Sequence, residues 1–186
     1  MKQDQTKGSS KTTGTRKTTG ASSAAGAAGR QQNASAAPDA ITLLIQDHDE
    51  VKKMFKEYER LGDSAQASKQ ELAEQICEAL TIHTQIEEEI FYPALREALD
   101  DDDMMDEADV EHAAAKELIE QIQGMDASES HYDAKVKVLG EEIEHHVKEE
   151  QNEMFAKAKK TKLDLKQLGQ EMFERKAELS ADSMDE

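Results

Sequence analysis

The residues best suited to chemistry in this 186-residue sequence are two histidine–glutamate pairs with the same spacing. Glu87 follows His83 by four positions, and Glu150 follows His146 by four positions. In an α-helix the members of such a pair lie one turn apart on the same face. His83 falls within the apolar stripe of its expected helix, where a buried imidazole and carboxylate need a strong partner. A metal ion shared by both pairs is the simplest explanation of the repeat.

The elements that would position these pairs are long amphipathic helices. Hydrophobic periodicity predicts helices over residues 39–61, 68–99, 104–123 and 130–160, joined by short turns. Asp39 is a suitable N-cap for the first helix, and Pro93 is expected to kink or shorten the second. Such helices predict an all-α, up-down-up-down four-helix bundle over residues 38–162. Residues 163–186 are expected to add a short fifth helix, which covers one end or one groove of the bundle, and a frayed end from residue 181.

The first and third helices also carry a histidine within the apolar stripe, at His48 and His112. The histidines of the first two helices are 35 residues apart, and those of the last two are 34 apart, so the chain resembles a duplicated helical hairpin. Antiparallel neighbours with matched spacing would bring all four imidazoles to one level of the core. The predicted metal ligands are therefore His48, His83, Glu87, His112, His146 and Glu150.

Four imidazole nitrogens and two carboxylates suit two divalent first-row metal ions. Each hairpin would supply two histidines to one ion, and the two glutamates would bridge the ions. His145 and Glu149 have the same four-residue spacing, but His145 points away from the apolar face and is expected at the surface or behind the ligands. Tyr92 is expected on the outer face, so no base or redox relay is predicted at the site.

Composition limits the classes of partner. The net charge of −18 argues against nucleic-acid or anionic-membrane binding by the folded part. Residues 1–37 are rich in Gly, Ser, Thr and Ala, carry mostly basic charges, and are predicted to form a disordered tail that could bind nucleic acid or protein. No apolar run approaches the roughly 20 residues of a membrane span. The single cysteine, Cys77, is expected off the apolar face, which suits a reducing, cytoplasmic compartment and excludes a zinc–thiolate site.

Four stretches of the sequence together carry a resemblance to a known family. They are Asp47 to Glu50, His83 to Leu95, Glu111-His112, and His145 to Phe155. In this order, over about residues 39–160, they resemble the hemerythrin-like family with the HHE cation-binding domain. The resemblance implies a non-haem diiron site, with two iron ions bridged by an oxo or hydroxo group, that meets O2, NO or peroxide.

The sequence departs from the oxygen carriers of this family at two positions. The carriers have a second histidine four residues after the ligand of the third helix, where this chain has Lys116. They have an aspartate five residues after the histidine of the fourth helix, where this chain has Gln151. With one histidine fewer, both irons would keep an open position. This favours sensing, iron handling or peroxide turnover over reversible oxygen transport.

Other interpretations of the same residues differ in metal or in role. A ferritin-like diiron protein needs two Glu-x-x-His motifs, and only Glu142 to His145 has that spacing. Zinc or manganese in the same bundle stays open, because these ligand types bind several metals. A regulatory or interaction module also stays open, in which the metal site is structural and the basic tail recruits a partner. The sequence does not fix the oligomeric state or decide whether a substrate is turned over.

Overall fold

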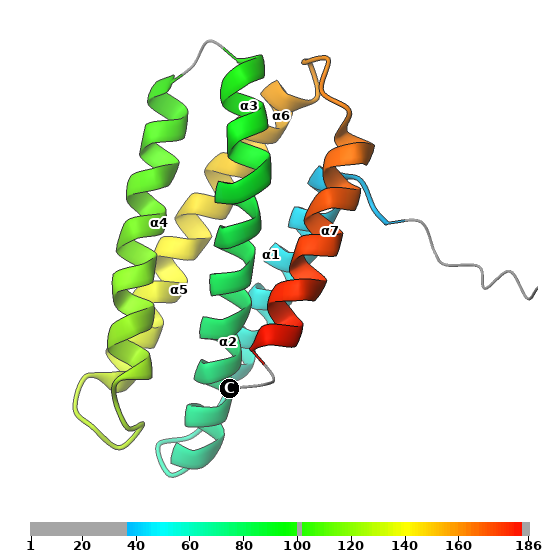
Figure 1. The fold of residues 1–186 in the computed structure, drawn as a ribbon. Helices are drawn as coiled ribbons and strands as arrows, with labels where there is room; N and C mark the ends of the chain where they lie inside the picture. Colours follow the sequence, from blue (N-terminus) through cyan, green and yellow to red (C-terminus); the bar gives the residue numbers. More distant parts are fainter. Residues whose placement is uncertain (1–36, 100–101, 184–186) are drawn as a thin grey trace, which may run out of the picture. The chain divides into compact units, whose positions relative to one another are not determined.

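The computed structural model describes residues 37–99 and 102–183, and every regular element within these ranges is helical. Four rods run alternately up and down beside one another (Figure 1). In chain order their elements are α1 (Ala40–Tyr58); α2 (Gln66–Ile86), η1 (Glu87–Phe91) and α3 (Tyr92–Ala98); α4 (Asp102–Gln123); and α5 (Tyr132–Glu149), η2 (Glu150–Met154) and α6 (Phe155–Ala158). The predicted all-α, up-down-up-down bundle is confirmed.

A fifth helix, α7 (Leu165–Asp182), packs against α1, α2 and η1 and runs along one side of the bundle (Figure 1). Asp164 caps α7 by accepting hydrogen bonds from two backbone N–H groups. Gly169 lies so close to the start of α1 that an added Cβ would be 2.2 Å from the carbonyl oxygen of Pro38. The predicted fifth helix is present. The chain was expected to fray from residue 181, but α7 continues through Ala181 and Asp182.

Two of the rods contain a π-helical turn, and each turn begins at the glutamate of a His–Glu pair. The turn η1 begins at Glu87 and η2 begins at Glu150. A π-helical turn adds about one residue to the helix, so everything after it is rotated by about 100° relative to an unbroken α-helix. Pro93 was expected to kink or shorten this rod; it follows η1 within the first turn of α3, and the helix continues to Ala98, so the proline does not shorten it. Single π-helical turns are frequent at functional sites.

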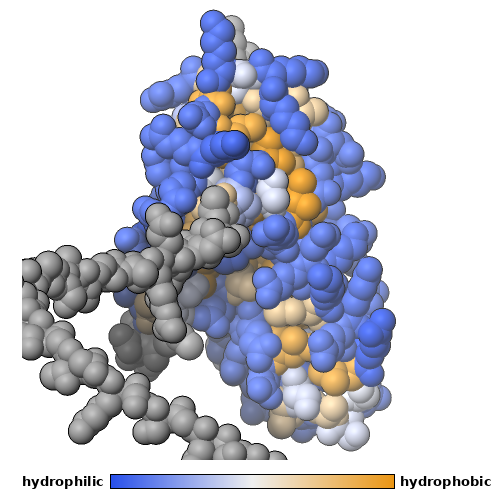
Figure 2. Space-filling view, turned by 90° about the vertical axis from the view of Figure 1, so that its right-hand side faces the viewer, coloured by the Kyte–Doolittle hydropathy of each residue, from blue (hydrophilic) through white to orange (hydrophobic). Residues whose placement is uncertain are grey.

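The core consists of two apolar clusters separated by a layer of polar side chains. Leu44 belongs to one cluster and Val51 to the other, with a histidine between them in α1. In α2, Ile86 and Leu80 flank another histidine in the same way. The outer surface in Figure 2 is mostly hydrophilic, with hydrophobic residues in limited patches. The buried polar layer contains the six predicted ligands, His48, His83, Glu87, His112, His146 and Glu150.

Single residues and the ends of the described chain agree with the sequence in part. The expectation that Cys77 lies off the apolar face is wrong, because only 1% of the residue is exposed. As a consequence, burial raises the pKa of its thiol to about 12. Asp39 does cap α1, since its side chain accepts a hydrogen bond from the backbone N–H of Thr42. Among the described residues, no helix is both long and apolar enough to cross a bilayer. Except for residue 37, the predicted basic tail lies outside the described residues.

Candidate metal centre

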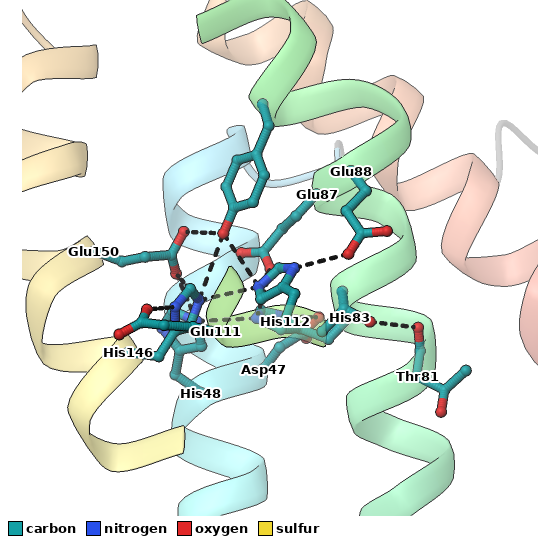
Figure 3. A network of polar contacts seen from close by, with 12 residues as sticks. Asp47, His48, Thr81, His83, Glu87, Glu88, Glu111, His112, His146 and Glu150 are labelled. Carbon is teal, nitrogen blue, oxygen red and sulfur yellow. Dashed lines mark hydrogen bonds and ion pairs between the residues drawn. The ribbon is translucent and has the colours of Figure 1, made fainter. Parts of the chain in front are cut away.

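Four histidines, one from each rod, meet in the polar layer with their Nε2 atoms facing one another (Figure 3). His48 Nε2 lies 3.0 Å from His83 Nε2, and His112 Nε2 lies 3.2 Å from His146 Nε2. None of the four residues is more than 5% exposed. The structure therefore brings the four imidazoles to one level, in the two pairs expected from the duplicated hairpin.

The opposite ring nitrogen, Nδ1, of each histidine faces a polar side chain outside this cluster. Three of the four partners are carboxylates, which favour a proton on Nδ1 and leave a lone pair on Nε2. Two of these carboxylates are fixed in turn by lysines, Asp47 by Lys176 at 2.5 Å and Glu88 by Lys116 at 2.6 Å. The Nδ1 contacts are His83 to Asp47 at 3.6 Å, His48 to the Gln151 amide at 3.1 Å, His112 to Glu88 at 3.0 Å, and His146 to Glu111 at 2.7 Å.

Each glutamate of the two pairs lies between the two histidine pairs. Glu87 Oε2 is 3.3 Å from His83 Nε2 and 3.5 Å from His112 Nε2. Glu150 Oε2 lies 3.2 Å from His48 Nε2 and 3.8 Å from His146 Nε2. Each carboxylate thus contacts one imidazole of each pair, as a group shared by two metal ions must.

The polar atoms that lack a partner show that a metal fits this donor set. Glu87 is 0% exposed and neither of its oxygens has a hydrogen-bond partner, and Glu150 Oε2 has none with suitable geometry. His112 and His146 each face a carboxylate through Nδ1, so with their protons on Nδ1 their facing Nε2 atoms would present lone pairs to one another. A cation accepts these lone pairs and compensates the buried carboxylates, so the residues present fit a metal centre.

The protonation states of Glu150 and His112 suit metal binding, whereas Glu87 would lose a proton when an ion binds. Burial, together with repulsion from Glu150, raises the pKa of Glu87 well above its usual range. Burial acts the same way on Glu150, but its close contact with His48 and the charge of His146 outweigh it and lower the pKa of Glu150 to about 2. Burial and the charge of His146 lower the pKa of His112 to about 4. A neutral imidazole and an ionised carboxylate are the forms that bind metal ions.

Tyr92 belongs to the centre, and the expectation that it points outward is wrong. It is 2% exposed, and its hydroxyl donates to Glu150 Oε1 at 3.1 Å and lies 3.3 Å from His112 Nε2. In an unbroken α-helix, Tyr92 would face away from His83, nine residues earlier. The turn η1 rotates it by about 100° toward the site. The only hint in the sequence is Pro93, which disfavours a regular helix just before it.

The two positions that differ from oxygen carriers have other contacts. Lys116 pairs with Glu88 and is half-exposed, away from the Nε2 atoms. Gln151 contacts the outer nitrogen of His48 instead of a metal-facing atom. His145, which was expected at the surface, has a side chain 63% exposed.

Residues 39–158 match the family model described as the hemerythrin HHE cation-binding domain. The chain belongs to this family. A metal-binding role follows from the family and from the clusters of histidine and glutamate described above.

Two known proteins are similar to this chain, one in structure and one in sequence. The fold is similar to the crystal structure of a hemerythrin HHE cation-binding domain-containing protein from Mycobacterium kansasii, with a TM-score of 0.67, 22% identity, and coverage of 79% of this chain and 90% of that one. A DNA nickase from Nostoc sp. (strain PCC 7120 / SAG 25.82 / UTEX 2576) is 32% identical over 110 residues, or 59% of this chain. The match spans only 30% of the length of the nickase.

Proposed function

We propose that this protein binds two iron ions in the polar layer and uses them to respond to O2, NO or peroxide, or to handle iron. The observation that supports the proposal most strongly is the placement of each buried glutamate between the two histidine pairs. One ion would be held by His48 and His83 and the other by His112 and His146, with Glu87 and Glu150 shared between them. When bound, the iron pair supplies electron transfer to the small ligand.

The spaces around the centre favour a small ligand. A closed cavity of about 10 Å³ lies among His48, His83, His112 and His146, with walls that include Val51 and Leu80. This volume corresponds to about one water-sized probe, so it accommodates a diatomic molecule better than an organic substrate. An open groove of about 840 Å³ between α1 and α5 reaches His48 from the surface and offers a route of access.

Tyr92 is the group of this chain best placed to hold or move a proton at the centre. Its hydroxyl already donates to Glu150 and lies between the two histidines of one pair, His112 and His146. Burial and the nearby carboxylates raise its pKa, so the phenol stays protonated at neutral pH. A protonated phenol beside the site favours peroxide or oxygen chemistry that consumes a proton.

The test of the proposal is a count of metal ions. The protein is reconstituted with Fe(II) without oxygen, freed of loosely bound iron, and analysed for iron per chain. We expect two ions per chain, and at most one in Glu87→Gln, because the shared carboxylate is lost. The control is Glu144→Gln, an exposed glutamate of α5. A single ion in the native protein, or two ions in Glu87→Gln, would refute the two-ion centre.

Metal identity is tested by competition. Native protein is offered equal amounts of Fe(II), Mn(II) and Zn(II) under chelator-buffered conditions, because affinities for such ligands overlap. Iron occupancy with reversible change of the absorption spectrum on adding dithionite and air supports the redox role. A centre that keeps zinc and shows no spectral change would favour a structural metal site instead.

A second role, as a regulatory or interaction module, is supported by one observation. The relative named a DNA nickase contains the matching segment within a chain about three times as long, so the bundle there is one part of a larger protein. In this chain the partner-binding part would be the basic residues 1–36. Removing them should abolish binding to DNA at low salt and leave metal binding unchanged, and retention of DNA binding would exclude the role.

A further inference from the structure

A second group of metal-binding side chains lies at the surface, beside the buried centre. It consists of Glu111 of α4 and His145 and Glu149 of α5, whose ligand atoms all lie within 4.8 Å of one another. His145 Nε2 is 3.3 Å from Glu149 Oε1 and 3.6 Å from Glu111 Oε1. The side chains are 63% exposed for His145, 41% for Glu149 and 24% for Glu111, so an ion could reach them directly from water.

Glu111 connects this surface group to the buried centre. Its Oε1 faces His145, while its Oε2 accepts a hydrogen bond from His146 Nδ1 at 2.7 Å (Figure 3). The adjacent residues His145 and His146 of α5 therefore contact the two oxygens of one carboxylate of α4. An ordinary ion pair between residues four apart on one helix face does not involve a third residue from another helix.

A cavity of about 260 Å³ between α4 and η2 is lined both by Glu111 and Glu149 of the surface group and by His146 and Glu150 of the centre. Among its lining residues Lys157 is the one lysine or arginine, and it contacts the sulfur of Met104. Glu150, which is 1% exposed and has an oxygen without a hydrogen-bond partner, also lines it. The carboxylates along the cavity are Asp103, Glu107, Glu111, Glu149, Glu150 and Glu153.

We propose that Glu111, His145 and Glu149 form a docking site for a divalent cation, from which the ion passes through this acidic cavity to the buried centre. Two carboxylates and one imidazole bind first-row divalent ions, and their exposure to water keeps the binding weak and reversible. A cleft lined by one sign of charge raises the local concentration of the opposite ion. The destination of the ion depends on the proposed iron centre, whereas the docking site itself does not.

The first experiment counts weakly bound Mn²⁺ by the electron paramagnetic resonance signal of the free ion. It uses the full-length protein, both as purified and after loading with Fe(II). We expect the native protein to bind one Mn²⁺ more per chain than His145→Ala. The matched control is His131→Asn, another exposed histidine, at a position with a φ of 75° that asparagine tolerates. Equal Mn²⁺ binding by native protein and His145→Ala would overturn the docking site.

The second experiment measures the rate at which iron enters the centre. Fe(II) is added without oxygen, a strong chelator is added after varied times, and the iron retained by the protein is counted. We expect His145→Ala to fill about tenfold more slowly, because it no longer holds the ion beside the cavity and so loses the raised local concentration, and to reach the same final iron content. His131→Asn should fill at the native rate.

The outcomes separate the two proposals. An unchanged filling rate in His145→Ala, with Mn²⁺ docking lost, would overturn the transit role. A native protein that retains no iron at any time would refute the proposed iron centre, and the difference in Mn²⁺ binding would still decide whether the docking site exists. Lost docking together with slow filling would support the whole route.

Discussion

Replacing Glu87 by glutamine should stabilise the metal-free protein and reduce the further stabilisation that metal binding gives. In the structure Glu87 is fully buried, both of its oxygens lack a hydrogen-bond partner, and Glu150 lies close enough to raise its pKa. Glutamine keeps the size of the side chain, carries no charge, and can donate a hydrogen bond to Glu150. Both effects follow because the buried carboxylate is unfavourable without a cation and is a ligand when one is bound.

The two effects have comparable sizes. An unsatisfied buried polar group costs about 1–3 kcal/mol, and more if charged, so metal-free Glu87→Gln should gain about that much. For a chain of this length, about 3 °C in melting temperature corresponds to 1 kcal/mol, so its Tm should rise by about 3–9 °C. If metal binding weakens about 100-fold, stabilisation by iron falls by about 2.7 kcal/mol, or about 8 °C.

The assay is thermal unfolding followed by circular dichroism, with and without Fe(II), under nitrogen. Glu144→Gln, which removes an exposed carboxylate from α5, serves as the control and should change stability by no more than about 0.5 kcal/mol. A metal-free Glu87→Gln protein that melts below the native protein would refute the argument that this carboxylate is held for a cation. So would an iron-induced rise in Tm as large as that of the native protein.

Three further changes probe the contacts of the centre and the packing of α7. Asp47→Asn should weaken metal affinity about 10–100-fold in a chelator competition, because Asp47 orients an imidazole, and unchanged affinity would contradict this. Tyr92→Phe should keep two irons per chain but react with peroxide at a different rate. When metal-free, it should lose about 1–3 kcal/mol of unfolding free energy, because the hydrogen bond to Glu150 is gone. An unchanged peroxide rate together with unchanged stability would contradict this contact. Gly169→Ala should lose about 1–3 kcal/mol in urea unfolding because its Cβ would clash with the start of α1. Gly62→Ala, with nothing within 4 Å of its added Cβ, should not.

The convergence of the histidines could be predicted because it depends only on regular periodicity. His48 and His112 lie in unbroken stretches of α1 and α4, and His83 and His146 precede the π-helical turns. Up to these points the 3.6-residue period holds, so the side-chain direction follows from counting. For Tyr92, which follows such a turn, counting along the helix gives the wrong face.

The environment of the histidines could not be predicted in the same way. Tyr92 follows η1, so its direction depends on one inserted residue that periodicity does not register. The partners of the outer ring nitrogens come from other rods, and Lys176, which fixes Asp47, comes from α7, 129 residues later. Such contacts depend on how the helices pack, and the pattern of any single helix does not contain them.

The duplicated hairpin produces a centre whose two halves are chemically different. Tyr92 and Phe155 occupy the same position, the residue directly after each π-helical turn. Tyr92 places a hydroxyl 3.3 Å from His112, whereas Phe155 stacks its ring on His48 with centroids 6.0 Å apart. One histidine pair therefore has a proton donor beside it and the other has a hydrocarbon wall. In the proposed two-ion centre, the surroundings of the two ions would therefore differ in polarity and in access to protons.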